Sequence, residues 1–178
     1  RGLRLPSDTD PAQMPAVLHP DWIDSMALPP KPDFGPLRID DRIEIFGGFD
    51  FETLPGGAIR IKGNWVHDHI TTITVPELVR AEGCPGGKVT CHKSAAAPIL
   101  ALFAEWSAAG LMPLVLTWAG CWAPRMIRGS TTVLSNHSWG TAFDINAAWN
   151  GLGKPPAPRG AKGSVVELVP IANRLGWY

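Results

Sequence analysis

One stretch of this chain carries most of its information: Ser135-Asn136-His137-Ser138-Trp139-Gly140-Thr141-Ala142-Phe143-Asp144. It fixes five residue types in the order S-x-H-x-x-G-x-A-x-D. Neutral imidazole and carboxylate oxygen are both good zinc ligands, and a catalytic zinc site usually takes three protein groups and a water. His137 and Asp144 are therefore the candidate metal ligands of the chain.

The second half of the stretch alternates like a half-buried strand. Over residues 141–147, Ala142, Asp144 and Asn146 are expected to share one face, and the small alanine leaves room beside the carboxylate. Gly140 permits a sharp turn that would bring the histidine back over that face. The pattern predicts a strand with the candidate ligands at its edge.

A histidine and an aspartate seven residues apart do not make a metal site by themselves. Alone, such a pair is more often a loop histidine and a capping aspartate. The added serine, glycine and alanine, together with an upstream arginine, shift our interpretation to a metal site.

The ten-residue run resembles the signature of the M15 family of zinc peptidases, which includes D-Ala-D-Ala carboxypeptidases, dipeptidases and L-alanyl-D-glutamate endopeptidases. The preceding residues 118–130 are also similar, with a glycine, an aromatic residue and the pair Pro124-Arg125 shortly before the motif. The resemblance covers roughly residues 88–178. It is greatest to the endopeptidase branch found in phage lysins and bacterial wall hydrolases.

The resemblance implies Zn²⁺ as cofactor, with His137 and Asp144 as ligands. It also implies a substrate-contacting role for Ser135, which has no nearby general base and is not expected to be a covalent nucleophile. A guanidinium is a fixed, permanently charged fork, suited to an oxyanion or a substrate carboxylate. Arg125 is the candidate for that role and Arg128 competes with it, a loop salt bridge being the alternative for either.

Tryptophans bracket the site segments. Trp139 lies inside the motif and is a candidate substrate-binding residue, since aromatic rings near a groove can stack on a wall polymer. Tryptophans are nevertheless more often part of the core.

The family's third zinc ligand and general base lie in a segment that follows a helix ending in Gly-aromatic. Here Gly176-Trp177 correspond to that ending, so no residue of this sequence takes those two roles by resemblance. Either the parent protein continues, or the domain is a degenerate descendant and this chain alone is inactive. His67 and His69 would share one strand face, which is a workable metal geometry, but a half-exposed histidine pair is the simpler interpretation.

The expected function is hydrolysis of peptide bonds in bacterial peptidoglycan, of the L-Ala-D-Glu or D-Ala-D-Ala type. The alternative is a catalytically inactive wall-binding or structural module of a phage tail or lysis apparatus. Either implies the peptidoglycan peptide stem as partner and a cell-envelope, periplasmic, extracellular or lysis-associated location, with room for further domains or subunits beyond either terminus.

Composition narrows the alternatives. Lys and Arg number 16, as do Asp and Glu, so the net charge is zero and a nucleic-acid partner is not expected. No apolar run approaches the ~18 residues of a membrane span.

The start shows no signal peptide and no initiator Met, which predicts a processed product or a piece of a longer chain. Cys84 and Cys91 could form a small loop disulfide, and Cys121 is expected to be a buried hydrophobe.

The chain divides into a proline-rich arm or linker, residues 1–37, anchored by Trp22 and Ile23, and an M15-like domain, residues 38–178. We expect an α+β fold in which helices pack on a small, mainly antiparallel sheet, with the site on its open face. The predicted elements are strands over 39–46, 58–62, 65–75, 88–92, 111–118 and 141–147, a hairpin turn at 62–64, and helices over 77–81, from 94 (capped by Ser94) to 109, and from 169 onward.

Overall fold

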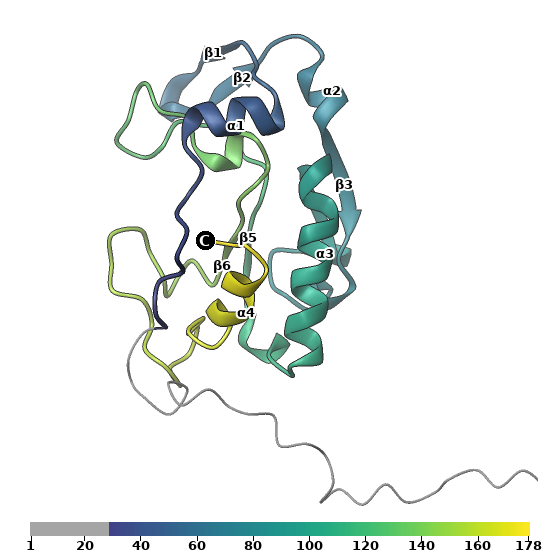
Figure 1. The fold of residues 1–178 in the computed structure, drawn as a ribbon, viewed down its shortest axis with the longest axis vertical. Helices are drawn as coiled ribbons and strands as arrows, with labels where there is room; N and C mark the ends of the chain where they lie inside the picture. Colours follow the sequence, from purple (N-terminus) through teal and green to yellow (C-terminus); the bar gives the residue numbers. More distant parts are fainter. Residues whose placement is uncertain (1–28) are drawn as a thin grey trace, which may run out of the picture.

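The structure, a computed structural model, describes residues 29–178. Most of the predicted arm, including its proposed anchors Trp22 and Ile23, lies outside these residues. Residues 29–37 have no regular structure and run along one side of the molecule (Figure 1). Their Phe34 ring meets the ring of Tyr178 edge-on, with 6.4 Å between centroids, so the segment before the first helix lies against the C-terminal residues.

The described residues form four helices and six strands, joined by loops and short 3₁₀ turns (Figure 1). The helices are α1 Ile39–Phe46, α2 Trp65–His69, α3 Lys93–Ala108 and α4 Val169–Arg174; the strands are β1 Phe51–Thr53, β2 Ile59–Ile61, β3 Ile70–Thr74, β4 Lys88–His92, β5 Trp118–Gly120 and β6 Asp144–Ile145. The predicted α+β class is confirmed. The strands form three separate antiparallel pairs, β1–β2, β3–β4 and β5–β6, where we expected one small sheet.

The predicted strand over 39–46 is wrong, because these residues form helix α1. Asp40 and Asp41 lie in its first turn, where negative charge is favoured, and the Asp41 carboxylate accepts a hydrogen bond from the Arg38 backbone N–H at 3.0 Å. Short apolar runs do not distinguish strand from helix, and here the acidic first turn decides.

The predicted strand over 65–75 is half wrong. Its first five residues form α2, whose first turn is closed by a 3.0 Å hydrogen bond from the Asp68 N–H to the Asn64 carbonyl. The rest forms β3, which pairs with β4 from Ile70 opposite His92 onward. Since β2 pairs with β1, the hairpin expected at 62–64 does not form.

The longest helix agrees with the prediction, α3 spanning Lys93–Ala108. Its cap differs: the Ser94 N–H donates to Nδ1 of His92 at 3.1 Å, so the histidine and not the serine caps the helix.

Helix α4 begins at Val169 with Pro170 in its first turn, as expected. The predicted helix over 77–81 is reduced to the 3₁₀ turn Pro76–Leu78. The predicted strand over 111–118 does not form: Met112–Leu114 make a 3₁₀ turn, and β5 begins only at Trp118.

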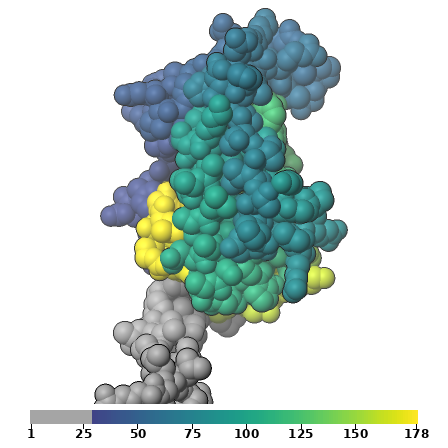
Figure 2. All heavy atoms as spheres, turned by 90° about the vertical axis from the view of Figure 1, so that its right-hand side faces the viewer, coloured from purple at the N-terminus to yellow at the C-terminus, as the bar shows by residue number. Residues whose placement is uncertain are grey.

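Two hydrophobic clusters hold the molecule together. The larger lies between α3, the β3–β4 pair and β5, and includes Leu102, Phe103 and Trp106. Figure 2 shows α3 running beside β3 and β4 on this face. The smaller cluster consists of five buried residues: Ile59, Trp65, Met126, Leu134 and Trp139. No helix within residues 29–178 has the length and apolar character needed to cross a membrane.

All three cysteines are buried and free, so Cys84 and Cys91 do not form the disulfide that their spacing permits. Burial raises the pKa of the Cys91 thiol to about 11 and that of the Cys121 thiol to about 12. Cys121 donates its S–H to the Gly140 carbonyl at 3.3 Å. The expectation of a buried, unreactive Cys121 agrees with this environment.

His92 should make folding stability depend on pH. Its Nδ1 accepts the cap hydrogen bond while its Nε2–H donates to the Phe46 carbonyl at 3.2 Å, so the folded state requires the neutral ring. Burial, with smaller contributions from His69 and Lys93, lowers its pKa below the ordinary 6.5. The stabilisation is therefore complete above pH 6.5 and is lost as pH falls towards the lower, folded-state pKa.

The variant His92→Asn keeps a good N-cap residue without the titration. We expect its free energy of unfolding in urea to fall less between pH 8 and pH 5 than that of the wild type. Equal pH dependence of the two proteins would contradict the assignment.

Candidate functional site

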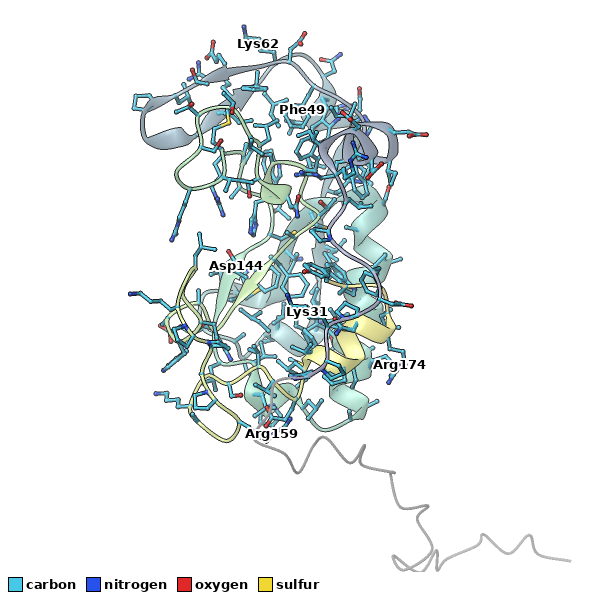
Figure 3. The ribbon with its side chains drawn as sticks, turned by 60° about the vertical axis from the view of Figure 1, so that its left-hand side comes forward. Lys31, Phe49, Lys62, Asp144, Arg159 and Arg174 are labelled. Carbon is cyan, nitrogen blue, oxygen red and sulfur yellow. The ribbon has the colours of Figure 1, made fainter. Side chains whose placement is uncertain are left out.

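The motif segment joins the two hydrophobic clusters. Trp139 belongs to the smaller cluster, whereas Phe143 and Ile145 pack against the larger one. Between them, the 3₁₀ turn Asn136–Ser138 carries the candidate histidine. Figure 3 shows the consequence for the other candidate ligand: Asp144 lies between the part of the molecule that carries Phe49 and the part that carries Arg159.

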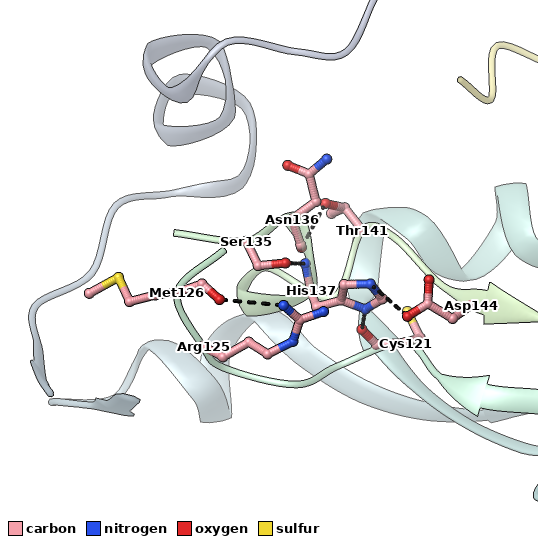
Figure 4. A network of polar contacts seen from close by, with 8 residues as sticks. All are labelled: Cys121, Arg125, Met126, Ser135, Asn136, His137, Thr141 and Asp144. Carbon is pink, nitrogen blue, oxygen red and sulfur yellow. Dashed lines mark hydrogen bonds and ion pairs between the residues drawn. The ribbon is translucent and has the colours of Figure 1, made fainter. Parts of the chain in front are cut away.

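The orientation of the His137 ring is set by one hydrogen bond. Nδ1–H donates to the Cys121 carbonyl at 2.8 Å (Figure 4). Since the carbonyl can only accept, Nδ1 carries a proton, and Nε2 is the ring nitrogen that faces Asp144. This is the arrangement in which a histidine ligand is oriented by a backbone carbonyl.

Asp144 is placed by strand pairing. β6 pairs with β5 so that Ile145 lies opposite Trp118 and Asp144 opposite Gly120. Ile145 packs on the core, and the Asp144 side chain, 54% exposed, faces outward. Its Oδ2 lies 3.3 Å from Nε2 of His137.

The Asp144 carboxylate is held ionised. Its pKa is lowered, first by the interaction with His137 and further by the positive charges of Arg125 and Arg128, although partial burial opposes this. A carboxylate must be deprotonated to ligate a metal ion, so the surroundings favour the ligating form at neutral pH.

The two donor atoms fit a shared zinc ion. Atoms each about 2.0–2.2 Å from one tetrahedral zinc lie about 3.3–3.5 Å apart, which matches the 3.3 Å between Nε2 of His137 and Oδ2 of Asp144. A charge-assisted N–H···O hydrogen bond would be shorter, about 2.7–2.9 Å. The distance between these two donor atoms is therefore compatible with a shared zinc ion.

These donors line a cleft of about 560 Å³. Ser135, Arg125 and Arg128 line the same cleft, so the structure brings together five of the six predicted site residues. Ile127 and Leu152, both partly exposed, add an apolar rim.

Ser135 and Arg125 also have structural contacts. The Ser135 Oγ accepts a hydrogen bond from the His137 N–H at 3.4 Å and so caps the turn. The Arg125 guanidinium donates to the neighbouring Met126 carbonyl at 3.3 Å (Figure 4). The backbone of Arg125 is clamped by Ser138, whose Oγ donates to its carbonyl at 2.8 Å and accepts from its N–H at 3.0 Å.

The structure does not bring Trp139 to the cleft. It is 1% exposed, and its indole N–H donates to the Gly47 carbonyl at 3.0 Å. It lies in the smaller hydrophobic cluster, which is the alternative that we weighed for the tryptophans.

No third ligand joins the pair within residues 29–178, where no group of three or more His, Cys, Asp or Glu side chains could hold a metal ion. His67 and His69 lie on α2 and not on a strand. His67 is exposed and contacts Asp68, while the His69 ring stacks between Trp65 and His92. The histidine pair therefore does not complete the site.

Asn146 departs from the predicted face. Its φ is +51°, and the side chain turns into the interior, where it bonds to the backbone of Leu114, Leu116, Thr117 and Gly163. It fixes the loop after β6, a role that period-two alternation does not predict. Sequence reasoning also missed Cys121 as the orienting carbonyl and Arg42 as a residue that lines the cleft.

The glycine of the motif is required by close packing. Gly140 has φ +68°, and a Cβ there would lie 2.8 Å from the His92 nitrogen and 3.1 Å from the Cys91 carbonyl carbon. Both are backbone atoms of the β4–α3 junction, which also donates a 2.9 Å hydrogen bond from the His92 N–H to the Gly140 carbonyl. The histidine turn is therefore set directly against this junction.

We expect Gly140→Ala to lower the free energy of unfolding by more than about 1 kcal/mol, because strain in φ and the backbone contact add. Gly129→Ala is the matched control, since Gly129 has φ +82° but open space around its Cβ position. Urea unfolding measures both variants. Equal losses would show that φ alone accounts for the glycine.

Residues 128–178 match an M15 peptidase family model described as D-alanyl-D-alanine carboxypeptidase. The match includes His137, Asp144 and Arg128, and Arg125 precedes it. Neither the curated proteins nor the solved structures contain a significant match to the chain. The match supports a peptidase of the D-Ala-D-Ala carboxypeptidase type over residues 128–178, the part of the chain that carries His137 and Asp144.

Proposed function

We propose that this chain is the body of a zinc-dependent peptidase that hydrolyses peptide bonds of bacterial peptidoglycan. The observation that carries the proposal is the pairing of Nε2 of His137 with Oδ2 of Asp144 at 3.3 Å in a cleft lined by two arginines. The family match supports peptidase activity of the D-Ala-D-Ala carboxypeptidase type. Zinc and the wall substrate are our extension of it.

His137 and Asp144 would hold the metal. When bound, zinc supplies Lewis-acid chemistry that polarises a scissile carbonyl and lowers the pKa of water. The hydrogen bond from His137 to Cys121 orients Nε2 towards Asp144, and His137, with smaller contributions from the two arginines, lowers the pKa of the Asp144 carboxyl. In the family that the motif resembles, a third ligand and a general base follow a Gly-aromatic pair, and residues 29–178 assign neither role.

The arginines suit the charge that develops during peptide hydrolysis. A guanidinium aimed into the cleft stabilises an oxyanion or anchors a substrate carboxylate. Arg125 and Arg128 both line the cleft, and both act electrostatically on Asp144. We assign the oxyanion role to Arg125 and substrate binding to Arg128, with Ser135 orienting the histidine turn beside the substrate.

The alternative, a catalytically inactive wall-binding module, is not favoured. Such a module needs neither a histidine tautomer prepared for metal nor an ionised carboxylate at ligand distance. A wall hydrolase acts in the cell envelope, the periplasm or outside the cell, and that is the location we propose. The peptide stem, with an L-Ala-D-Glu or D-Ala-D-Ala bond, is the proposed substrate.

We expect the natural full-length protein to bind about one zinc per molecule and to release peptides from purified peptidoglycan. His137→Ala or Asp144→Asn should weaken zinc binding more than about 100-fold, since each removes a direct ligand. His67→Ala is the matched control, because that side chain is 90% exposed and lies outside the site. Calorimetric zinc titration and mass spectrometry of the released peptides measure the two properties.

Stoichiometric zinc and undiminished turnover in His137→Ala would overturn the ligand assignment. Zinc-free protein that binds walls but releases no peptide would favour the inactive module. The mass of the released peptides distinguishes the two bond types: loss of a terminal alanine marks a carboxypeptidase, and release of a longer stem marks an endopeptidase.

A further inference from the structure

Helix α1 buries a charge and exposes its apolar residues. Arg42 is the one buried residue of α1, at 8% exposure, whereas Ile39, Ile43 and Ile45 are exposed. Burial of a guanidinium is costly unless hydrogen bonds and favourable charge interactions compensate it. The contacts of Arg42 therefore indicate the role of α1.

Two of the hydrogen bonds of the Arg42 side chain lead to the start of the motif segment. Nη1 donates to the Leu134 carbonyl at 3.3 Å and to Oδ1 of Asn136 at 2.5 Å, while Nε donates to the Arg38 carbonyl at 3.4 Å within α1. The guanidinium carbon lies 5.2 Å from the centre of the Trp139 ring, within cation–π range. Arg42 thus touches residues on both sides of His137, more than 90 positions away in the sequence.

The opposite side of the same turn is held by the segment before it. The Ser135 N–H donates to the Arg125 carbonyl at 3.0 Å, and the Ala123 N–H donates to the His137 carbonyl at 3.0 Å. On the α1 side, the Trp139 indole adds its bond to Gly47, the residue that ends α1. The histidine turn therefore makes hydrogen bonds to residues 121–126 on one side and to α1 and its C-terminal residue on the other.

We propose that Arg42 is a positioning residue that holds the His137 turn in its ligating geometry and makes α1 part of the site. The proposal rests on the zinc-peptidase function proposed above. Arg42 lies well before the residues matched by the family model, so the match does not include it. Arg42 and Asn136 both line the cleft.

The size and planarity of the guanidinium explain why an arginine is found here. Nη1 donates to Leu134 and Asn136, Nε donates to the Arg38 carbonyl on another side of the group, and the guanidinium carbon lies over the Trp139 ring. A lysine ammonium carries the same charge but cannot make this combination of contacts. The role therefore depends on shape as well as on charge.

The first test compares Arg42→Met with Arg38→Met in the full-length protein. Arg38 lies at the start of the same helix, its side chain is 82% exposed, and it makes no contact with the turn through its side chain. We expect the zinc dissociation constant of Arg42→Met to rise about tenfold or more, the usual effect of losing a partner that orients a ligand. Arg38→Met should bind zinc like the wild type.

A metal-free test separates this proposal from the zinc function. The ¹⁵N chemical shifts of the His137 ring report which nitrogen carries the proton, and the wild type should show Nδ1–H. In Arg42→Met we expect a mixture of tautomers, with faster hydrogen exchange at the His137 amide and the Trp139 indole but unchanged exchange in α3. If the wild-type protein binds no zinc, the zinc function is refuted. The tautomer of His137 and the hydrogen exchange rates would still test whether Arg42 holds the turn.

Two further variants keep the proposal testable if Arg42→Met does not fold. Asn136→Ala removes one acceptor and leaves the stack on Trp139, and we expect a smaller shift in the same direction in both tests. Arg42→Lys should resemble Arg42→Met. Wild-type zinc affinity, tautomer and exchange in Arg42→Met or Asn136→Ala, or full restoration by lysine, would overturn the role assigned to the guanidinium.

Discussion

The hydrogen bond from Nδ1 of His137 to the Cys121 carbonyl is the constraint on which the site depends. It fixes the orientation of the ring, and with it the direction in which Nε2 faces. The carbonyl belongs to the residue directly after β5, and β5 is also the strand that pairs with β6 and places Asp144. Strand β5 therefore positions both candidate ligands: it pairs with β6, which carries Asp144, and the residue after it orients His137.

Packing explains why the motif contains small residues between its ligands. The histidine turn lies where the two hydrophobic clusters meet, with Trp139 in one and Phe143 in the other. To reach both, the chain passes directly over the β4–α3 junction, where Gly140 leaves no space for a Cβ. The spacing between His137 and Asp144 is thus the length of chain needed to cross from one cluster to the other.

The sequence predicted what depends on local pattern and missed what depends on distant contacts. The helix near 94–109 and the proline in the first turn of α4 follow from periodicity and capping, and both are present. The helix at Ile39–Phe46 was missed because its apolar residues do not mark a buried face. Its buried residue, Arg42, is stabilised by groups more than 90 positions away, which no local pattern contains. The motif paired His137 with Asp144, and the structure places these two side chains 3.3 Å apart, but the carbonyl that orients His137 is a backbone group without a sequence signal.

The positive charges around the cleft favour the ionised form of Asp144 but oppose the binding of a divalent cation. Arg125 and Arg128 help to keep Asp144 ionised, and so preserve a metal ligand at neutral pH. The same positive charges oppose a divalent cation and attract an anionic group, since the signs of two charges decide whether they attract or repel. In the zinc site that we propose, donor geometry would have to overcome this repulsion, and the His137 turn is held from two sides. The arginines would then be available for the negative charge that develops during peptide hydrolysis.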